Sequence, residues 1–169
     1  KNQHSKNQPH AEALYIFAVL LIGGPVTEAF IEENPTVIRT ILIKGNQTLN
    51  ELHYAIFNAF AREDEHLYEF QIGGAGPNAP AATRYGLKSG DDFAGDYEEG
   101  LIDARSSTIN DLELSKEDVF GYWFDFGDDW WHQVEVVSIR NKAPKGKYPR
   151  VSSRKGASPP QYPDWDEED

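Results

Sequence analysis

Candidate catalytic and ligand-binding side chains are concentrated in one aromatic stretch, residues 120–137. Its sequence, FGYWFDFGDDWWHQVEVV, places two alternating apolar segments around Gly127-Asp128-Asp129, which predicts a β-hairpin. If the connection has two or four residues, Asp125 lies directly opposite His132, and a carboxylate then sits beside an imidazole on one face. The side chains that would point to the other face are Phe124, Phe126, Trp131 and Gln133.

Asp125 and His132 are the candidate catalytic pair. A carboxylate beside a histidine fixes the tautomer of the ring and raises its pKa, which suits a general base. Single Asp–His pairs are also common structural elements, so we favour the alternative of a cross-strand ion pair or a turn-stabilising aspartate. Asp128 and Asp129 resemble a metal-binding pair, but tight hairpin turns require the same residue types. The hairpin therefore leaves open whether the protein is an enzyme.

A metal site is a second possibility for the same residues. His66 ends the run Glu63-Asp64-Glu65-His66, and it could join His132 and Asp125 in a site of two histidines and one carboxylate. We predict no cofactor apart from a divalent metal that these three residues could hold. The chain has no cysteine, which excludes thiolate ligands and cysteine nucleophiles. His53 lies off the apolar stripe of a predicted helix, and we expect a solvated or packing histidine there.

The hairpin also offers candidate binding residues. They are its aromatic side chains and turn carboxylates: Tyr122, Trp123, Trp130, Trp131, Asp128 and Asp129. With the alternation described above, Trp123 and Trp131 fall on opposite faces, so at least one large ring should be exposed or covered by another segment. One interpretation is a cover formed by the Pro-rich C-terminal segment, because proline packs well on aromatic rings. The other is an aromatic groove for a peptide, nucleotide or sugar.

Hydrophobic periodicity predicts the strands and the helix on which these residues lie. Residues 14–22 form a strand that we expect to be buried on both faces, and residues 37–43 and 67–72 form two more. Thr48-Leu49-Asn50-Glu51 is a capping box that opens an amphipathic helix. The order β-β-α-β-loop-β-β predicts a single α+β domain, with one main helix packed on a mixed or antiparallel sheet. This order is compatible with a β-grasp-like arrangement.

The chain divides into four parts by composition. We expect a loose arm over 1–13, the α+β domain over 14–139, a Pro-rich basic strap of the same domain over 140–163, and an acidic tail over 164–169. Within the domain, residues 73–107 are rich in Gly, Pro, Ala and acids, which predicts a long loop that is functional or mobile. The strap has neither a helical nor a strand period, so we expect it to extend over the domain.

Charge is unevenly distributed along the chain. The net charge is −12, and residues 11–139 hold seven Lys and Arg against 23 Asp and Glu. Residues 140–155 hold seven basic side chains and no acidic one. Because an acidic body repels phosphate, we do not expect nucleic acid as a partner, and the basic stretch should fold back on the acidic surface. Binding of nucleic acid by this stretch is the alternative.

Several motifs resemble those of the plasmid pRiA4b ORF-3-like family of bacteria and archaea. They are TLNELHYAIFNAF (48–60), EDEHLYEFQIGG (63–74), FGYWFDFGDDWWHQVEV (120–136), and the C-terminal KGKYPRV and GASPPQYPD. The resemblance implies a compact α+β domain and supplies no catalytic residue. Many relatives carry cysteines where this chain has Val151 and Ser158, so no thiol or metal role transfers there.

Some members of the family are described as resolvase-like or transposon-associated. A serine recombinase needs an activated serine among arginines that hold phosphates. Here the serines at 106, 107, 152 and 153 lie in predicted loops, and the acidic body has few arginines. The sequence therefore gives little support to a recombinase.

We predict a cytoplasmic binding or adaptor module, since no apolar run approaches a membrane span and no secretion signal is recognisable. Its ligand would be a protein, a peptide or a small molecule, bound by the aromatic hairpin and the loop over 73–107. The first alternative is a metal-assisted hydrolase that acts on a small or phosphorylated substrate through Asp125, His132 and His66. The second is a nucleic-acid accessory protein of a mobile element that uses the basic stretch from Arg140 to Lys155.

Overall fold

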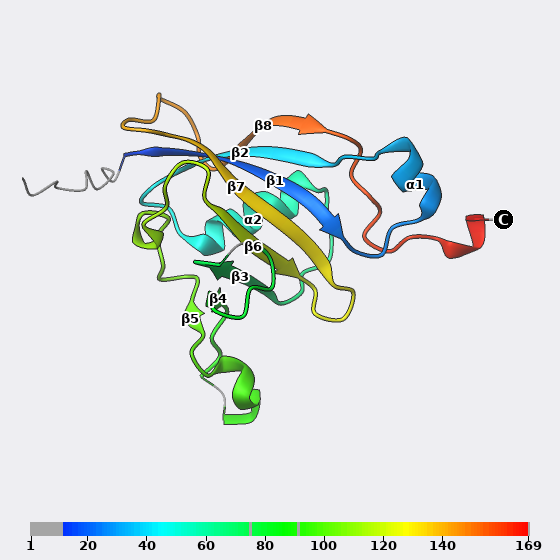
Figure 1. The fold of residues 1–169 in the computed structure, drawn as a ribbon, viewed down its shortest axis with the longest axis horizontal. Helices are drawn as coiled ribbons and strands as arrows, with labels where there is room; N and C mark the ends of the chain where they lie inside the picture. Colours follow the sequence, from blue (N-terminus) through cyan, green and yellow to red (C-terminus); the bar gives the residue numbers. More distant parts are fainter. Residues whose placement is uncertain (1–11, 75, 91, 169) are drawn as a thin grey trace, which may run out of the picture.

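The protein is a single α+β domain built on one mixed sheet (Figure 1). The computed structural model describes residues 12–168, apart from residues 75 and 91. Eight strands lie in the order β5-β4-β3-β6-β7-β1-β2-β8, and all neighbours pair antiparallel except β4 and β5. The strands are β1 (Leu14–Gly23), β2 (Ile38–Lys44), β3 (Tyr68–Ile72), β4 (Thr83–Gly86), β5 (Ile102–Asp103), β6 (Val119–Phe124), β7 (Trp130–Arg140) and β8 (Arg150–Lys155). The helices are α1 (Glu28–Glu33) and α2 (Leu49–Ala59), with short 3-10 turns at η1 (Asp92–Glu98), η2 (Asn110–Leu112) and η3 (Trp165–Glu168).

These elements confirm the predicted α+β class, the mixed sheet and the one main helix. A β-grasp-like arrangement stays a prediction. None of the helices in the described part of the chain is long and apolar enough to cross a membrane.

Helix α2 covers one face of the sheet and forms the core with it. The predicted capping box is present, because the Glu51 amide donates to Thr48 Oγ1 (3.1 Å) and the Thr48 amide donates to Glu51 Oε1 (3.3 Å). On β1, Tyr15, Phe17 and Val19 are fully buried on this inner face. The outer face of β1 is only partly buried, and Ile22 at its end is 50% exposed, so the expectation that this strand is buried on both faces was wrong.

The segment over 73–107 is not one long loop. It contains β4, η1 and β5, which extend the sheet beyond β3. It also covers the outer face of β3, where Gln71 donates to Glu69 (3.1 Å) and the Asn78 amide donates to Gln71. Gly121 on β6 is required by this packing, since a Cβ there would lie 2.6 Å from Pro77 Cα. The covered part of the outer face therefore ends near β6.

The basic stretch contains an edge strand that periodicity did not predict. Residues Arg150–Lys155 form β8, which pairs antiparallel with β2 at the border of the sheet (Figure 1). Val151 packs against the core, but the other five residues of this strand are polar, so it lacks the alternation by which a half-buried strand is recognised. The following segment, 157–163, crosses back to the body of the domain. There Gln161 accepts from the Glu63 and Asp64 amides (2.9 and 3.0 Å).

Candidate functional site

The register of the aromatic hairpin differs from the predicted one. Strands β6 and β7 pair Tyr122 with His132 and Trp123 with Trp131, so Asp125 does not lie opposite His132. The connection has five residues, 125–129, whereas the prediction assumed two or four. Each strand position therefore faces a different partner from the one expected.

Asp125 closes the hairpin turn, which is the structural role that we favoured for it. It has a left-handed backbone (φ 60°), and its Oδ1 accepts from the Gly127 and Asp128 amides (3.1 and 3.2 Å). Its carbonyl accepts from the Asp129 amide at 2.7 Å. Asp129 also has a positive φ (59°), and its carboxylate accepts a 2.9 Å hydrogen bond from Trp123 Nε1. The turn carboxylates thus hold the hairpin tip together.

His132 lies on the inner face, fully buried under α2 and the neighbouring aromatic rings. Its Nδ1 lies 3.1 Å from the Tyr122 carbonyl oxygen, so Nδ1 donates and Nε2 is the acceptor. Nε2 accepts from Arg62 Nη2 at 2.8 Å. Burial and the nearby Arg62 charge lower the pKa of His132 well below its usual value. His132 is therefore a neutral core histidine with both ring nitrogens engaged.

Arg62, which sequence reasoning missed, is the centre of this buried arrangement. Its guanidinium lies 4.9 to 5.0 Å from the ring centroids of Phe60, Phe124 and Trp130. Burial lowers the pKa of Arg62 to about 10, so the group stays charged at neutral pH. The residue follows the last turn of α2, where an arginine normally indicates a solvated helix end, and no local signal predicts its burial.

A second neutral histidine, His53, lies beside this arrangement. Its ring stacks on Tyr68 with centroids 3.8 Å apart, Nδ1 lies 2.6 Å from the Tyr122 hydroxyl, and Nε2 lies 3.4 Å from Glu65 Oε2. Burial, with a contribution from Arg62, lowers the pKa of His53 to about 3. We expected His53 to be either solvated or packed in the core. It is only 1% exposed, which supports packing.

Two of the three candidate metal ligands lie together. His66 Nε2 is 3.4 Å from Asp125 Oδ2, and the same nitrogen is 2.9 Å from the Tyr162 hydroxyl. His132 points into the core toward Arg62 instead. Within the described ranges, no three His, Asp or Glu side chains are placed to hold a metal ion. The geometry gives a surface Asp–His–Tyr contact rather than a three-ligand site.

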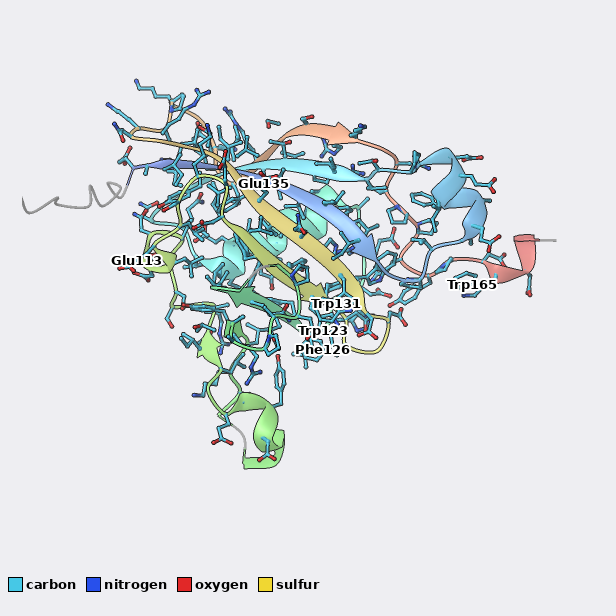
Figure 2. The ribbon with its side chains drawn as sticks, viewed as in Figure 1. Glu113, Trp123, Phe126, Trp131, Glu135 and Trp165 are labelled. Carbon is cyan, nitrogen blue, oxygen red and sulfur yellow. The ribbon has the colours of Figure 1, made fainter. Side chains whose placement is uncertain are left out.

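The outer face of the hairpin carries a stack of aromatic rings (Figure 2). Trp123 and Trp131 lie on the same face, and their rings are nearly parallel (3°) with centroids 4.9 Å apart, so the prediction of opposite faces was wrong. Phe126 stacks on Trp123 at 4.1 Å, and Tyr97 meets Phe126 edge-on at 5.3 Å. Trp131, Trp123 and Phe126 are only partly buried. We call these three residues the aromatic stack.

Trp130 and Tyr122, the other predicted aromatic binding residues, face the opposite way. Both are fully buried on the inner face, where Trp130 packs against Arg62 and Gly24. A Cβ at residue 24 would lie 2.3 Å from the Trp130 ring. Asp128, in contrast, is exposed at the hairpin tip. The predicted binding residues thus separate into a core set and a surface set.

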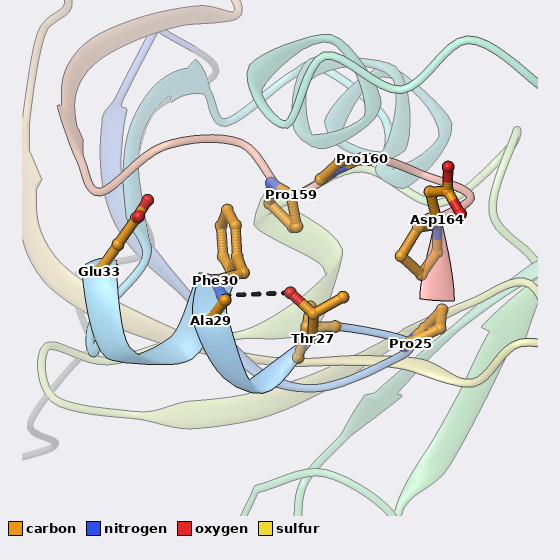
Figure 3. Close-up of a pocket in the computed structure, with 10 residues that line it drawn as sticks. Pro25, Thr27, Ala29, Phe30, Glu33, Pro159, Pro160 and Asp164 are labelled. Atoms are coloured by element: carbon orange, nitrogen blue, oxygen red, sulfur yellow. Dashed lines mark hydrogen bonds between the residues drawn. The ribbon is translucent and has the colours of Figure 1, made fainter. Parts of the chain in front are cut away.

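The prolines of the C-terminal segment line a separate groove of about 260 Å³ beside α1 (Figure 3). The Phe30 ring points from α1 toward Pro159. Pro25 and Thr27 line the same groove. Thr27 caps α1 by accepting from the Phe30 amide at 3.1 Å. These prolines therefore face α1.

The fold and the hairpin define a class of α+β domain in which one helix covers the inner face of a mixed sheet and an aromatic hairpin forms its two central strands. The chain belongs to the plasmid pRiA4b ORF-3-like protein family, whose model matches residues 29–162. The resemblance seen in the sequence motifs is thereby confirmed.

A solved structure shares the fold. The crystal structure of a protein of unknown function, MM3350 from Methanosarcina mazei Go1, matches with a TM-score of 0.65 at 23% sequence identity. The match covers 87% of this chain and 71% of that chain. At this identity the likeness establishes the fold alone. No curated protein matches the chain.

Proposed function

We propose that the protein is a binding module and that the aromatic stack of Trp131, Trp123 and Phe126 is its contact surface. The observation that carries this proposal is a set of large rings stacked face to face yet left partly exposed on a strand pair. Aromatic side chains give large contact areas at low cost in conformational entropy, and they are enriched where proteins bind partners.

The charges around the stack indicate the class of ligand. Asp129 is hydrogen-bonded to Trp123, and Asp128 is exposed beside it on the hairpin turn. Carboxylates beside exposed rings favour a cation that can stack on an aromatic face, as an arginine side chain does. The ligand is therefore a basic segment of a partner protein that presents arginine to the stack.

The hydrolase alternative receives less support from the same geometry. A general base must reach a substrate proton, but His132 is fully buried and both its ring nitrogens are engaged. Its lowered pKa also makes it a poor proton acceptor. Asp125 is committed to the hairpin turn through its Oδ1.

A titration with an arginine-rich synthetic peptide tests the proposal. Trp131→Ala should weaken binding at least about tenfold, which is the loss expected for a central aromatic contact. Trp165→Ala is the matched control, because Trp165 is 53% exposed and lies away from the hairpin. Equal binding by both variants, each shown to be folded by circular dichroism, would contradict the proposal.

A further inference from the structure

The last strand of the sheet leaves one edge free. β8 pairs with β2 on one side and ends the strand order, so no other described strand pairs with its second edge. A free edge presents backbone N–H and C=O groups that can pair with another extended chain. This edge lies far along the sheet from β6 and β7, with β1 and β2 between them and β8.

A helix face runs beside this edge. Glu51, Tyr54, Ala55 and Asn58 follow the spacing i, i+3, i+4 and i+7, so they share one face of α2. Together with residues 149–151 they line a groove of about 400 Å³. Tyr54 is 46% exposed, and the small Ala55 side chain keeps the floor of the groove low. A groove between a helix and a free strand edge is the geometry in which extended peptides bind by strand addition.

The charge at this edge is strongly basic. All seven Lys and Arg side chains of residues 140–155 are exposed, and none forms an ion pair with another described residue. Arg150 is held in place at the groove, since its guanidinium lies 4.9 Å from the centroid of the Tyr148 ring. We expected the basic stretch to fold back on the acidic surface, but among the described residues no close ion pair holds it there.

One acidic residue lines the groove, and both of its carboxylate oxygens already accept hydrogen bonds. Glu51 Oε2 accepts from Gln47 Nε2 at 2.9 Å, and Oε1 accepts from the Thr48 amide in the capping box. The remaining groove residues of α2 are neutral. Three cations, Arg150, Arg154 and Lys155, therefore lie along the edge against one carboxylate in the groove, so the net charge there is positive.

We propose that the β8 edge and the facing side of α2 bind an extended acidic segment of a partner protein by strand addition. The backbone of that segment would pair with β8, and its carboxylates would meet the exposed Arg and Lys side chains. A second copy of this chain is disfavoured at the edge, because two β8 strands would bring like charges together. This surface is distinct from the aromatic stack, and the opposite charge gives it a different partner.

The test uses the full chain and a synthetic peptide that alternates Glu with Val. Arg150→Glu combined with Arg154→Glu should weaken binding at least about tenfold, whereas Lys88→Glu combined with Lys116→Glu should leave it within about twofold. Both double variants change the net charge equally, and all four side chains are exposed. Tyr54→Ala, which changes no charge, should also weaken binding.

Backbone pairing is tested separately from charge. The same peptide with N-methyl groups on alternate residues cannot form the strand hydrogen bonds and should bind at least about tenfold more weakly. Amide hydrogen exchange of β8 should slow when the unmodified peptide is bound. Three results would overturn the proposal: equal binding of the N-methylated peptide, equal losses in the two double variants, or tighter binding of a single-stranded oligonucleotide than of the peptide. A dimer that forms through β8 would overturn it as well.

Discussion

The two faces of the β6–β7 hairpin carry similar residues, but those on one face are buried and those on the other are exposed. On the inner face, His132 and Trp130 surround the Arg62 guanidinium and are fully buried. On the outer face, Trp123 and Trp131 stack on each other and stay partly exposed. Alternation along the strands separates neighbours in sequence, so that Trp130 belongs to the core and Trp131 to the surface.

In this hairpin the exposed aromatic rings are better candidates for a functional role than the ionisable histidines. The imidazoles of His53 and His132 are buried and have lowered pKa values, so they stabilise the fold in their neutral forms. The outer-face rings, by contrast, are only partly buried and accessible to a partner, so we expect them to stabilise the sheet less than the buried rings do. Inner-face substitutions should therefore act on stability, and outer-face substitutions should act on binding.

Arg62→Ala should have the largest effect on stability. It removes a side chain that packs against three rings, and it leaves His132 Nε2 without its donor, so we expect a loss of about 3–5 kcal/mol. Urea unfolding measures this loss. Arg154→Ala, at an exposed position, is the control and should change the free energy of unfolding by less than about 0.5 kcal/mol. Similar values for the two variants would remove the distinction between core and surface.

Acid should destabilise the inner face next most strongly. The pKa of His53 is about 3 in the folded protein and about 6.5 when unfolded, so the unfolded state binds more protons between these values. The contribution of His53 to the free energy of unfolding is present when the pH is above about 6.5. It is lost progressively as the pH falls toward 3. Between pH 7.5 and pH 5 the loss from His53 is about 2 kcal/mol, and His132 acts in the same direction.

Urea unfolding at these two pH values, with His53→Phe for comparison, measures the loss. The variant has no imidazole to protonate at this position, so its stability should depend less steeply on pH. An unchanged slope in the variant would show that His53 is not held neutral by the fold.

Tyr122→Phe should have a smaller effect. The change removes only the hydroxyl, which leaves the buried His53 Nδ1 without its 2.6 Å partner, and we expect a loss of about 2 kcal/mol. Thermal unfolding followed by circular dichroism measures it. Tyr54→Phe, which removes a hydroxyl from a 46% exposed ring, is the matched control and should be close to neutral.

Local signals in the sequence predicted the local structure well. The capping box at Thr48 and Glu51, the helix that it opens and the strands around it all follow from short-range patterns. The hairpin register does not follow from short-range patterns, because it depends on the left-handed backbone of Asp125, which lengthens the turn to five residues. Strand β8 was missed because five of its six residues are polar, and the burial of Arg62 depends on residues distant in sequence, namely Phe124, Trp130 and His132.

Trp131→Ala should have the smallest effect on stability and a large effect on binding. Its ring packs mainly on Trp123 at the surface, so the loss in unfolding free energy should be about 1 kcal/mol. Urea unfolding under the conditions used for Arg62→Ala gives a direct comparison. A loss as large as that of Arg62→Ala would mean that the stack is part of the core.

The most direct test of the binding surface is calorimetric titration of the arginine-rich peptide into two hairpin variants. The variants are Trp131→Ala on the outer face and His132→Gln on the inner face, where the glutamine carbonyl can still accept from Arg62. If the aromatic stack is the contact surface, folded His132→Gln should bind within about twofold of the unmodified chain, while Trp131→Ala should bind at least about tenfold more weakly. Loss of binding in folded His132→Gln together with full binding by Trp131→Ala would contradict this assignment.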